Sequence, residues 1–245
     1  MAELVPAEVA AAAAQSPFVH QVAGLLRWVG AGRKLTATGA LTLADARILV
    51  EALGTGDEMD PRIGEATFRT KTSAELLNLG LIVAWARAAG LVRTVKGRLV
   101  PVKKSAALIE DPPGLWLRLF EVFPRLEPAF LPPGWGESFL RAQFTVGAEV
   151  LLSALHTHPG AAGLDELNDR TWQAVTARYA LGHTSEVHLE TARRCNDRDV
   201  RRTLATLTRL GAVTMTEESA ALTPAGRYAS GSRRGELHRT HGALR

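Results

Sequence analysis

Apolar and polar positions alternate along the first hundred residues with two periods, one helical and one extended. Residues 6–30 and 42–53 repeat apolar side chains at helical spacing and are followed by paired glycines, so we predict helices there. Residues 73–89 are apolar almost all round, which is typical of a buried helix. Residues 91–102 alternate around Lys96-Gly97, which predicts a β-ribbon with a two-residue turn.

Shorter pieces complete this first unit. Residues 33–39 predict a short extended piece, and residues 57–72 contain no periodicity and are interpreted as a loop. The predicted order is therefore helix, short strand, helix, helix and ribbon. The same order is predicted over residues 146–226, where helices over 146–155 and 164–180 precede a third helix and a second ribbon.

The third helix of the second unit, predicted over residues 196–210, has two contrasting faces. At about 100° per residue its apolar side chains fall in one sector. These are Val200, Leu204, Leu207 and Leu210. The opposite side gathers the arginines Arg198, Arg201, Arg202 and Arg209. A solvated helix face and a nucleic-acid contact are both consistent with this pattern.

The boundaries of this helix and the segment after it favour the second interpretation. Asn196 or Asp197 suits the N-cap, because its side-chain oxygen accepts from free backbone N–H groups, and Gly211 suits the C′ position. Residues 213–216 and 221–223 then predict a ribbon around a polar turn. A basic helix followed directly by a ribbon is the arrangement that reads DNA in helix-turn-helix proteins.

Between the two units, residues 105–145 hold six of the twelve prolines and seven of the twelve Phe and Trp residues. Leu115 to Phe123 predicts a helix ended by Pro124, and residues 128–136 predict a rigid irregular stretch. The aromatic content indicates a packed connecting layer, with a pocket for a small effector as the alternative. The aromatic residues are Trp116, Phe120, Phe123, Phe130, Trp135, Phe139 and Phe144.

Charge adds to the picture through its distribution more than through its total. Of the 29 basic residues 24 are arginine and 5 lysine, a ratio that a GC-rich genome produces by codon bias, so the net charge of +4 is weak support for nucleic acid. Residues 191–245, however, carry 11 arginines against 5 acidic residues, which leaves +6 there and −2 in residues 1–190. A single cysteine, the lack of a long apolar run and an acidic N-terminus predict a cytoplasmic protein.

Residues 195–227 resemble the winged helix-turn-helix superfamily of bacterial regulators. The resemblance rests on a polar helix start, inward Val200 and Leu204, Arg-Leu-Gly-Ala-Val entering the ribbon and Leu-Thr-Pro-Ala-Gly-Arg leaving it. It implies a helix in the major groove and a wing near the backbone. Residues 73–102 resemble the same unit, but their third helix is apolar, so we do not expect it to read bases. The whole chain is also similar to uncharacterised actinobacterial proteins, which implies no activity.

No catalytic motif is present in the sequence. Phosphate-loop, nucleophile-elbow and dinucleotide-binding patterns are absent. Four histidines are possible metal ligands: His156, His158, His183 and His188. A His-x-His followed by Pro-Gly is, however, more typical of a helix end. We therefore expect a protein that is not an enzyme and that uses no cofactor or metal.

The predicted fold is mainly α (α+β), with two winged-helix units and short β-ribbons. The expected segments are an N-terminal unit (1–104), an aromatic and proline-rich connector (105–145), a C-terminal winged helix (146–228) and a disordered basic tail (229–245). The expected function is a transcriptional regulator that binds double-stranded DNA. Its predicted contacts are Arg198, Arg201, Arg202, Arg209 and Thr206, with Lys96 and Arg98 as secondary phosphate contacts.

The alternative is a non-catalytic interaction or chromosome-associated scaffold. Tandem winged helices also bind proteins, for instance in proteins resembling the segregation-and-condensation partner family, and the apolar first unit favours a protein partner. A homodimer is compatible with either function.

Overall fold

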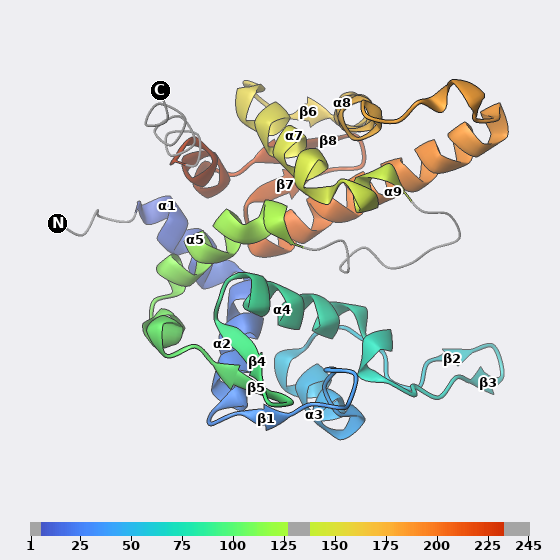
Figure 1. Ribbon diagram of the computed structural model, residues 1–245. Coiled ribbons are helices and arrows are strands. Elements are labelled where there is room, and N and C mark those ends of the chain that lie inside the picture. Colours follow the sequence, from blue (N-terminus) through green and yellow to red (C-terminus); the bar gives the residue numbers. More distant parts are fainter. Residues whose placement is uncertain (1–5, 127–137, 233–245) are drawn as a thin grey trace.

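The computed structural model describes residues 6–126 and 138–232 and shows a mainly helical chain with small antiparallel sheets (Figure 1). The N-terminal and C-terminal halves lie one above the other, and α9 runs along the side of the C-terminal half that faces the N-terminal half. The elements of the N-terminal half are α1 (Ala7–Gln15), α2 (Pro17–Val29), β1 (Arg33–Lys34), α3 (Leu43–Leu53), β2 (Arg62–Ile63), β3 (Ala66–Thr67), η1 (Ser73–Glu75), α4 (Leu77–Ala88), β4 (Val92–Val95) and β5 (Arg98–Pro101).

The predicted ribbon of the N-terminal half is confirmed. β4 and β5 pair antiparallel with Val95 opposite Arg98, and the intervening Lys96 and Gly97 have φ angles of 47° and 69°. β1 joins the other edge of β5, which gives the sheet order β1-β5-β4. The first strand of this half therefore pairs with the last, and α2 and α4 pack against the sheet.

The loop predicted over residues 57–72 contains a small hairpin formed by β2 and β3. It projects from the body of the molecule (Figure 1). Its base is closed by side chains: the amide of Asp60 donates to Oγ1 of Thr70 at 2.9 Å, and the amide of Thr70 donates to Oδ1 of Asp60 at 2.8 Å. The prediction missed this hairpin because it depends on polar closure and a glycine turn and has no alternation of apolar residues.

The C-terminal half repeats the order seen in the N-terminal half. Its sheet has the order β6-β8-β7, so the first strand again pairs with the last. Its elements are α6 (Phe139–Ala142), α7 (Phe144–Thr157), β6 (Ala162–Gly163), α8 (Leu164–Thr176), η5 (Leu181–His183), α9 (Glu186–Leu210), β7 (Val213–Met215) and β8 (Ser219–Leu222).

The start predicted for α9 is wrong. The helix begins at Glu186, ten residues before the predicted N-cap, and contains 25 residues. Asn196 is completely buried inside it, where its Oδ1 accepts from the amide of Leu140 at 3.1 Å. The end is as predicted, because Gly211 adopts the left-handed conformation with φ 84°.

After β8 the chain forms another helix, over residues 224–232. The prediction of disorder from residue 229 is therefore wrong for residues 229–232, since Ala229 is 4% exposed and packs into the core. A short apolar turn is enough to dock this segment, although it lacks the periodicity of a longer helix. The rest of the predicted basic tail, residues 233–245, lies outside the described residues.

The predicted connecting layer is confirmed for the part of the connector that the structure describes. Residues 105–126 contain most of η2 (Lys103–Ile109), α5 (Pro112–Val122) and η3 (Phe123–Arg125), while residues 138–145 form α6 and the start of α7 in the C-terminal half. Trp116, Phe120 and Phe123 are buried, and one continuous apolar core runs through both halves and this layer. Phe130, Trp135 and the irregular stretch over residues 128–136 lie outside the described residues.

Candidate nucleic-acid interface

The candidate interface is the exposed side of α9. Val200, Leu204 and Leu207 on its inner side are completely buried against its own half, which fixes the opposite side outward. Because α9 begins at Glu186, the outward side extends one turn further than predicted and includes Arg194, which is exposed. The sequence signal that could have found Arg194 is the spacing of four residues to Arg198. We call Arg194, Arg198, Arg201 and Arg202 the arginine stripe.

The predicted members of the arginine stripe are exposed but differ in their local partners. Arg198 donates from Nε to Oδ1 of the buried Asp199 at 2.9 Å, and this hydrogen bond raises the pKa of the Arg198 guanidinium. Arg201 donates to the carbonyl of Glu217 at 3.0 Å. Within the residues that the structure describes, the guanidinium of Arg202 has no hydrogen bond or ion pair.

Arg209 and Thr206 lie apart from the arginine stripe. Arg209 is half-buried against the N-terminal half: it donates to Oδ1 of Asn78 at 2.9 Å and to Oε1 of Gln21 at 3.3 Å, and its guanidinium lies 5.7 Å from the ring centroid of Phe18. Burial lowers the pKa of Arg209. Thr206 is 5% exposed, and its hydroxyl donates to the carbonyl of Arg202. Both predicted contacts are therefore engaged within the protein.

Arg193, next to the arginine stripe, is held by partners within the protein. It pairs with Asp169 of α8 and with Asp197 at 3.1 Å, and its guanidinium lies 5.4 Å from the ring centroid of Trp172. Burial raises the pKa of Asp197. Arg193 thus fastens α9 to α8, while Arg194 is exposed and donates to Oγ1 of Thr191 on its own helix, at 3.3 Å.

A cleft of about 400 Å³ separates the last turns of α9 from the N-terminal half. Arg202 and Arg209 line its α9 side, and Asp57 and Glu58 line the other. Asp57 accepts from the amides of Asn78 and Leu79 and so caps α4. Arg202 is exposed at the edge of this cleft, whereas Arg194, Arg198 and Arg201 are exposed and do not line it.

The two ribbons differ in charge. Residues 213–222 contain no lysine or arginine and place Glu217 and Glu218 at the turn, which disfavours a phosphate contact by this ribbon. In the first ribbon Lys96 is exposed at the turn, and Arg98 is exposed while donating to the carbonyl of Gly32 at 2.8 Å. The structure therefore separates the predicted secondary contacts from the arginine stripe.

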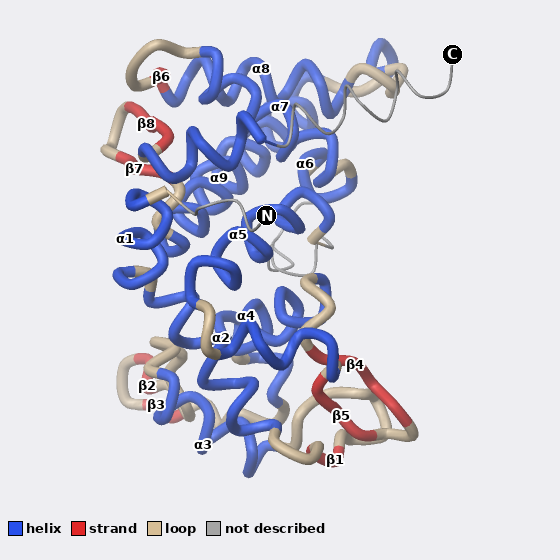
Figure 2. The backbone as a smooth tube through the Cα atoms, turned by 90° about the vertical axis from the view of Figure 1, so that its left-hand side faces the viewer, coloured by secondary structure: helices blue, strands red, loops and turns tan. Residues whose placement is uncertain are grey.

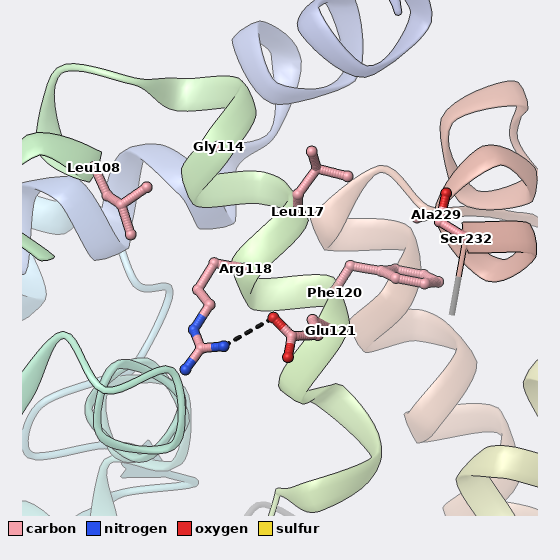
Figure 3. A pocket seen from close by; sticks show the side chains of 8 residues that line it. All are labelled: Leu108, Gly114, Leu117, Arg118, Phe120, Glu121, Ala229 and Ser232. Carbon is pink, nitrogen blue, oxygen red and sulfur yellow. Dashed lines mark hydrogen bonds and ion pairs between the residues drawn. The ribbon is translucent and has the colours of Figure 1, made fainter. Parts of the chain in front are cut away.

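The alternative effector pocket has a counterpart beside α5. A hollow of about 390 Å³ lies between α5 and the helix over residues 224–232 (Figure 3). Its lining is mostly apolar, and its two charged side chains, Arg118 and Glu121, pair with each other at 2.8 Å. Arg118 also donates to the carbonyl of Ala89. These pairings leave no charge aimed at a ligand.

Metal binding and membrane insertion gain no support from the residues that the structure describes. No group of three or more His, Cys, Asp or Glu side chains is placed to hold a metal within residues 6–126 and 138–232. His158 accepts from the amide of Gly160 at 3.2 Å, as in an exposed helix end. Within the same residues no helix combines the length and apolarity needed to cross a membrane.

Neither a protein-family model, nor a curated protein, nor a solved structure matches the chain. Function is therefore argued from the residues themselves.

Proposed function

We propose that the chain is a transcriptional regulator that binds double-stranded DNA through the exposed side of α9. The observation that carries this proposal is the arginine stripe, in which Arg194, Arg198 and Arg201 follow one another at helical spacing on the side opposite buried Val200 and Leu204. Arginine at this spacing presents guanidinium groups along a helix that fits the major groove.

The order of elements supports a winged-helix interpretation of both halves. In each half a helix, a short strand and two helices precede a ribbon, and the short strand pairs with the last strand. In such a unit α9 is the helix that enters the groove. The acidic turn at Glu217 and Glu218 makes this ribbon a poor phosphate contact, so α9 supplies most of the affinity.

The test is the salt dependence of binding to random duplex DNA, measured by fluorescence anisotropy. Single variants Arg194→Ala, Arg201→Ala and Arg202→Ala are each expected to flatten the slope of log affinity against log salt by about 1 for a lost phosphate contact. Arg170→Ala is the matched control, because Arg170 is also an exposed arginine of the same half, on α8, where it pairs with Glu166. Slopes that stay unchanged in all three variants would reject the proposal.

A second candidate is a non-catalytic scaffold that binds a protein. The placement of α4 favours it: Leu79, Ile82 and Trp85 are buried, so the helix that would read bases in the N-terminal half is part of the core. The projecting hairpin also exposes Ile63 and Phe68, which are 67% and 52% accessible. Absence of DNA retention at low salt, together with a partner lost on Ile63→Ser and Phe68→Ser, would favour this function.

A further inference from the structure

The densest group of lysines lies on the sheet of the N-terminal half, away from the arginine stripe. Four of the five lysines of the chain fall in or directly beside this sheet, although lysine is rare in the sequence. They are Lys34, Lys96, Lys103 and Lys104. Residues 28–44 and 91–109, which contain the sheet and its flanks, hold no acidic residue. Codon bias explains why lysine is rare, but it does not explain why four of the five lysines lie in or directly beside this one sheet.

Strand register places Lys34 and two arginines of the sheet on one face. Lys34 is opposite Arg98 across β1 and β5, and Arg93 lies two residues from Val95, the partner of Arg98 on β4. Because side chains alternate along a strand, Lys34, Arg93 and Arg98 share the face opposite buried Leu99. All three are exposed. With Lys96 at the turn they form what we call the lysine surface.

Two features of the lysine surface are locally unfavourable. Lys34 and Arg98 lie directly opposite each other on neighbouring strands. Like charges in such a pair are destabilising. Lys96 occupies the first turn position with φ 47°, a conformation that favours Gly, Asn or Asp. Each of these two features lowers the stability of the fold and could be removed by one substitution. Because both occur on the same surface, they point to a role in binding.

The lysine surface and the arginine stripe lie on separate parts of the molecule. In two perpendicular views α2 and α4 lie between α9 and the β1-β5-β4 sheet (Figures 1 and 2). The outer face of the sheet turns away from α2 and α4, since its inner side, with Leu99, packs on them. A duplex seated on α9 therefore leaves the lysine surface open.

We infer that the lysine surface binds the phosphate backbone of a second DNA duplex, so that one molecule joins two duplexes. The inference rests on the proposed function for the first duplex. Exposed lysines and arginines on the face of a small sheet, with no helix among them to enter a groove, suit sequence-independent contact with the backbone. The arginine stripe therefore binds the first duplex, and the lysine surface holds the second duplex on another side of the same molecule.

The experiment is a recruitment assay with the full chain. A biotinylated 20-base-pair duplex is fixed to beads, and capture of a fluorescent duplex is measured, while anisotropy gives the affinity for one duplex. The first variant combines Lys34→Gln, Arg93→Gln and Lys96→Asn, and the second combines Arg194→Ala, Arg201→Ala and Arg202→Ala. Each is expected to bind single duplex and to lose recruitment at least tenfold.

The outcomes separate the two proposals. Wild-type protein that binds one duplex per molecule and recruits none overturns the inference and leaves the proposed function intact. Recruitment that persists without the lysine surface assigns bridging to a dimer and also overturns the inference. If the first variant loses all DNA binding and the second variant loses none, both the inference and the proposed function are overturned. Unchanged recruitment with lost binding to phosphatidylserine vesicles would assign the surface to a membrane instead.

The single variant Lys96→Asn provides a readout that a structural role would not give. Asn is favoured at φ 47° and Lys is not, so the variant is expected to unfold at a higher urea concentration than wild type. Its recruitment of the second duplex is expected to fall. A variant that is more stable and recruits as well as wild type would remove Lys96 from the surface.

Discussion

Nη1 of Arg209 donates to Oδ1 of Asn78 at 2.9 Å, although 131 residues separate the two in the chain. This contact joins the end of α9 to the start of α4, and Nη2 of the same guanidinium reaches Gln21 of α2. The adjoining backbone is also held, since the indole of Trp116 donates to the carbonyl of Leu210 at 2.6 Å. The orientation of α9 is therefore set by the N-terminal half and by α5 as well as by its own half.

Replacing Arg209 with Ala is expected to lower the free energy of unfolding by about 1–3 kcal/mol, because Asn78 and Gln21 lose a charged donor in a half-buried place. Urea unfolding followed by circular dichroism measures the change. Arg170→Ala is the control, since an exposed ion pair contributes about 0–1 kcal/mol. Equal effects of the two variants would mean that the contact does not join the halves.

Ser138 is expected to be as sensitive as a core residue. Its hydroxyl donates to Oδ2 of Asp199 at 2.6 Å and accepts from the amide of Arg141 at 3.0 Å, so it caps α6 and satisfies a buried carboxylate of α9 together. Ser138→Ala should cost about 1–3 kcal/mol of unfolding free energy, and Ser138→Thr should restore most of it. Equal stability of the Ala and Thr variants would show that the hydroxyl contributes little.

The hairpin base is expected to open in acid. Hydrogen bonds from Arg47 and Thr70 lower the pKa of Asp60 below its ordinary 3.8. A depressed pKa stabilises the folded form above 3.8, and this contribution is lost as the pH falls through the lower folded value. Exchange protection of the Thr70 amide should therefore fall in that acid range and be insensitive to pH in Asp60→Asn. Protection that persists in wild type would exclude this closure.

The ribbon around Lys96-Gly97 could be predicted because its turn and strand alternation are local properties of the sequence. The start of α9 could not, because Asn196 resembles an N-cap but bonds to the amide of Leu140, far away in the chain. Helical periodicity likewise gave Arg209 the correct angle around α9 without revealing its neighbours. Angle is a local property, whereas the cover supplied by Asn78 and Gln21 depends on how the two halves pack.

The acidic turn of the second ribbon offers a gain of binding. Glu217 and Glu218 are exposed beside Arg201, which donates to the carbonyl of Glu217. If the arginine stripe lies on DNA, these carboxylates face the phosphates and oppose binding. The variant Glu217→Lys with Glu218→Lys should therefore bind random duplex more tightly and steepen the salt slope by about 1 for each new phosphate contact.

The control for this gain is Glu65→Lys, which adds positive charge on the distant hairpin. Anisotropy titrations over a range of salt concentrations compare the variants. A general effect of net charge would raise affinity in Glu65→Lys as well, per charge added, because non-specific attraction depends on the whole field of the protein. A gain confined to the ribbon variant would locate the duplex beside Arg201, whereas equal gains would place it elsewhere.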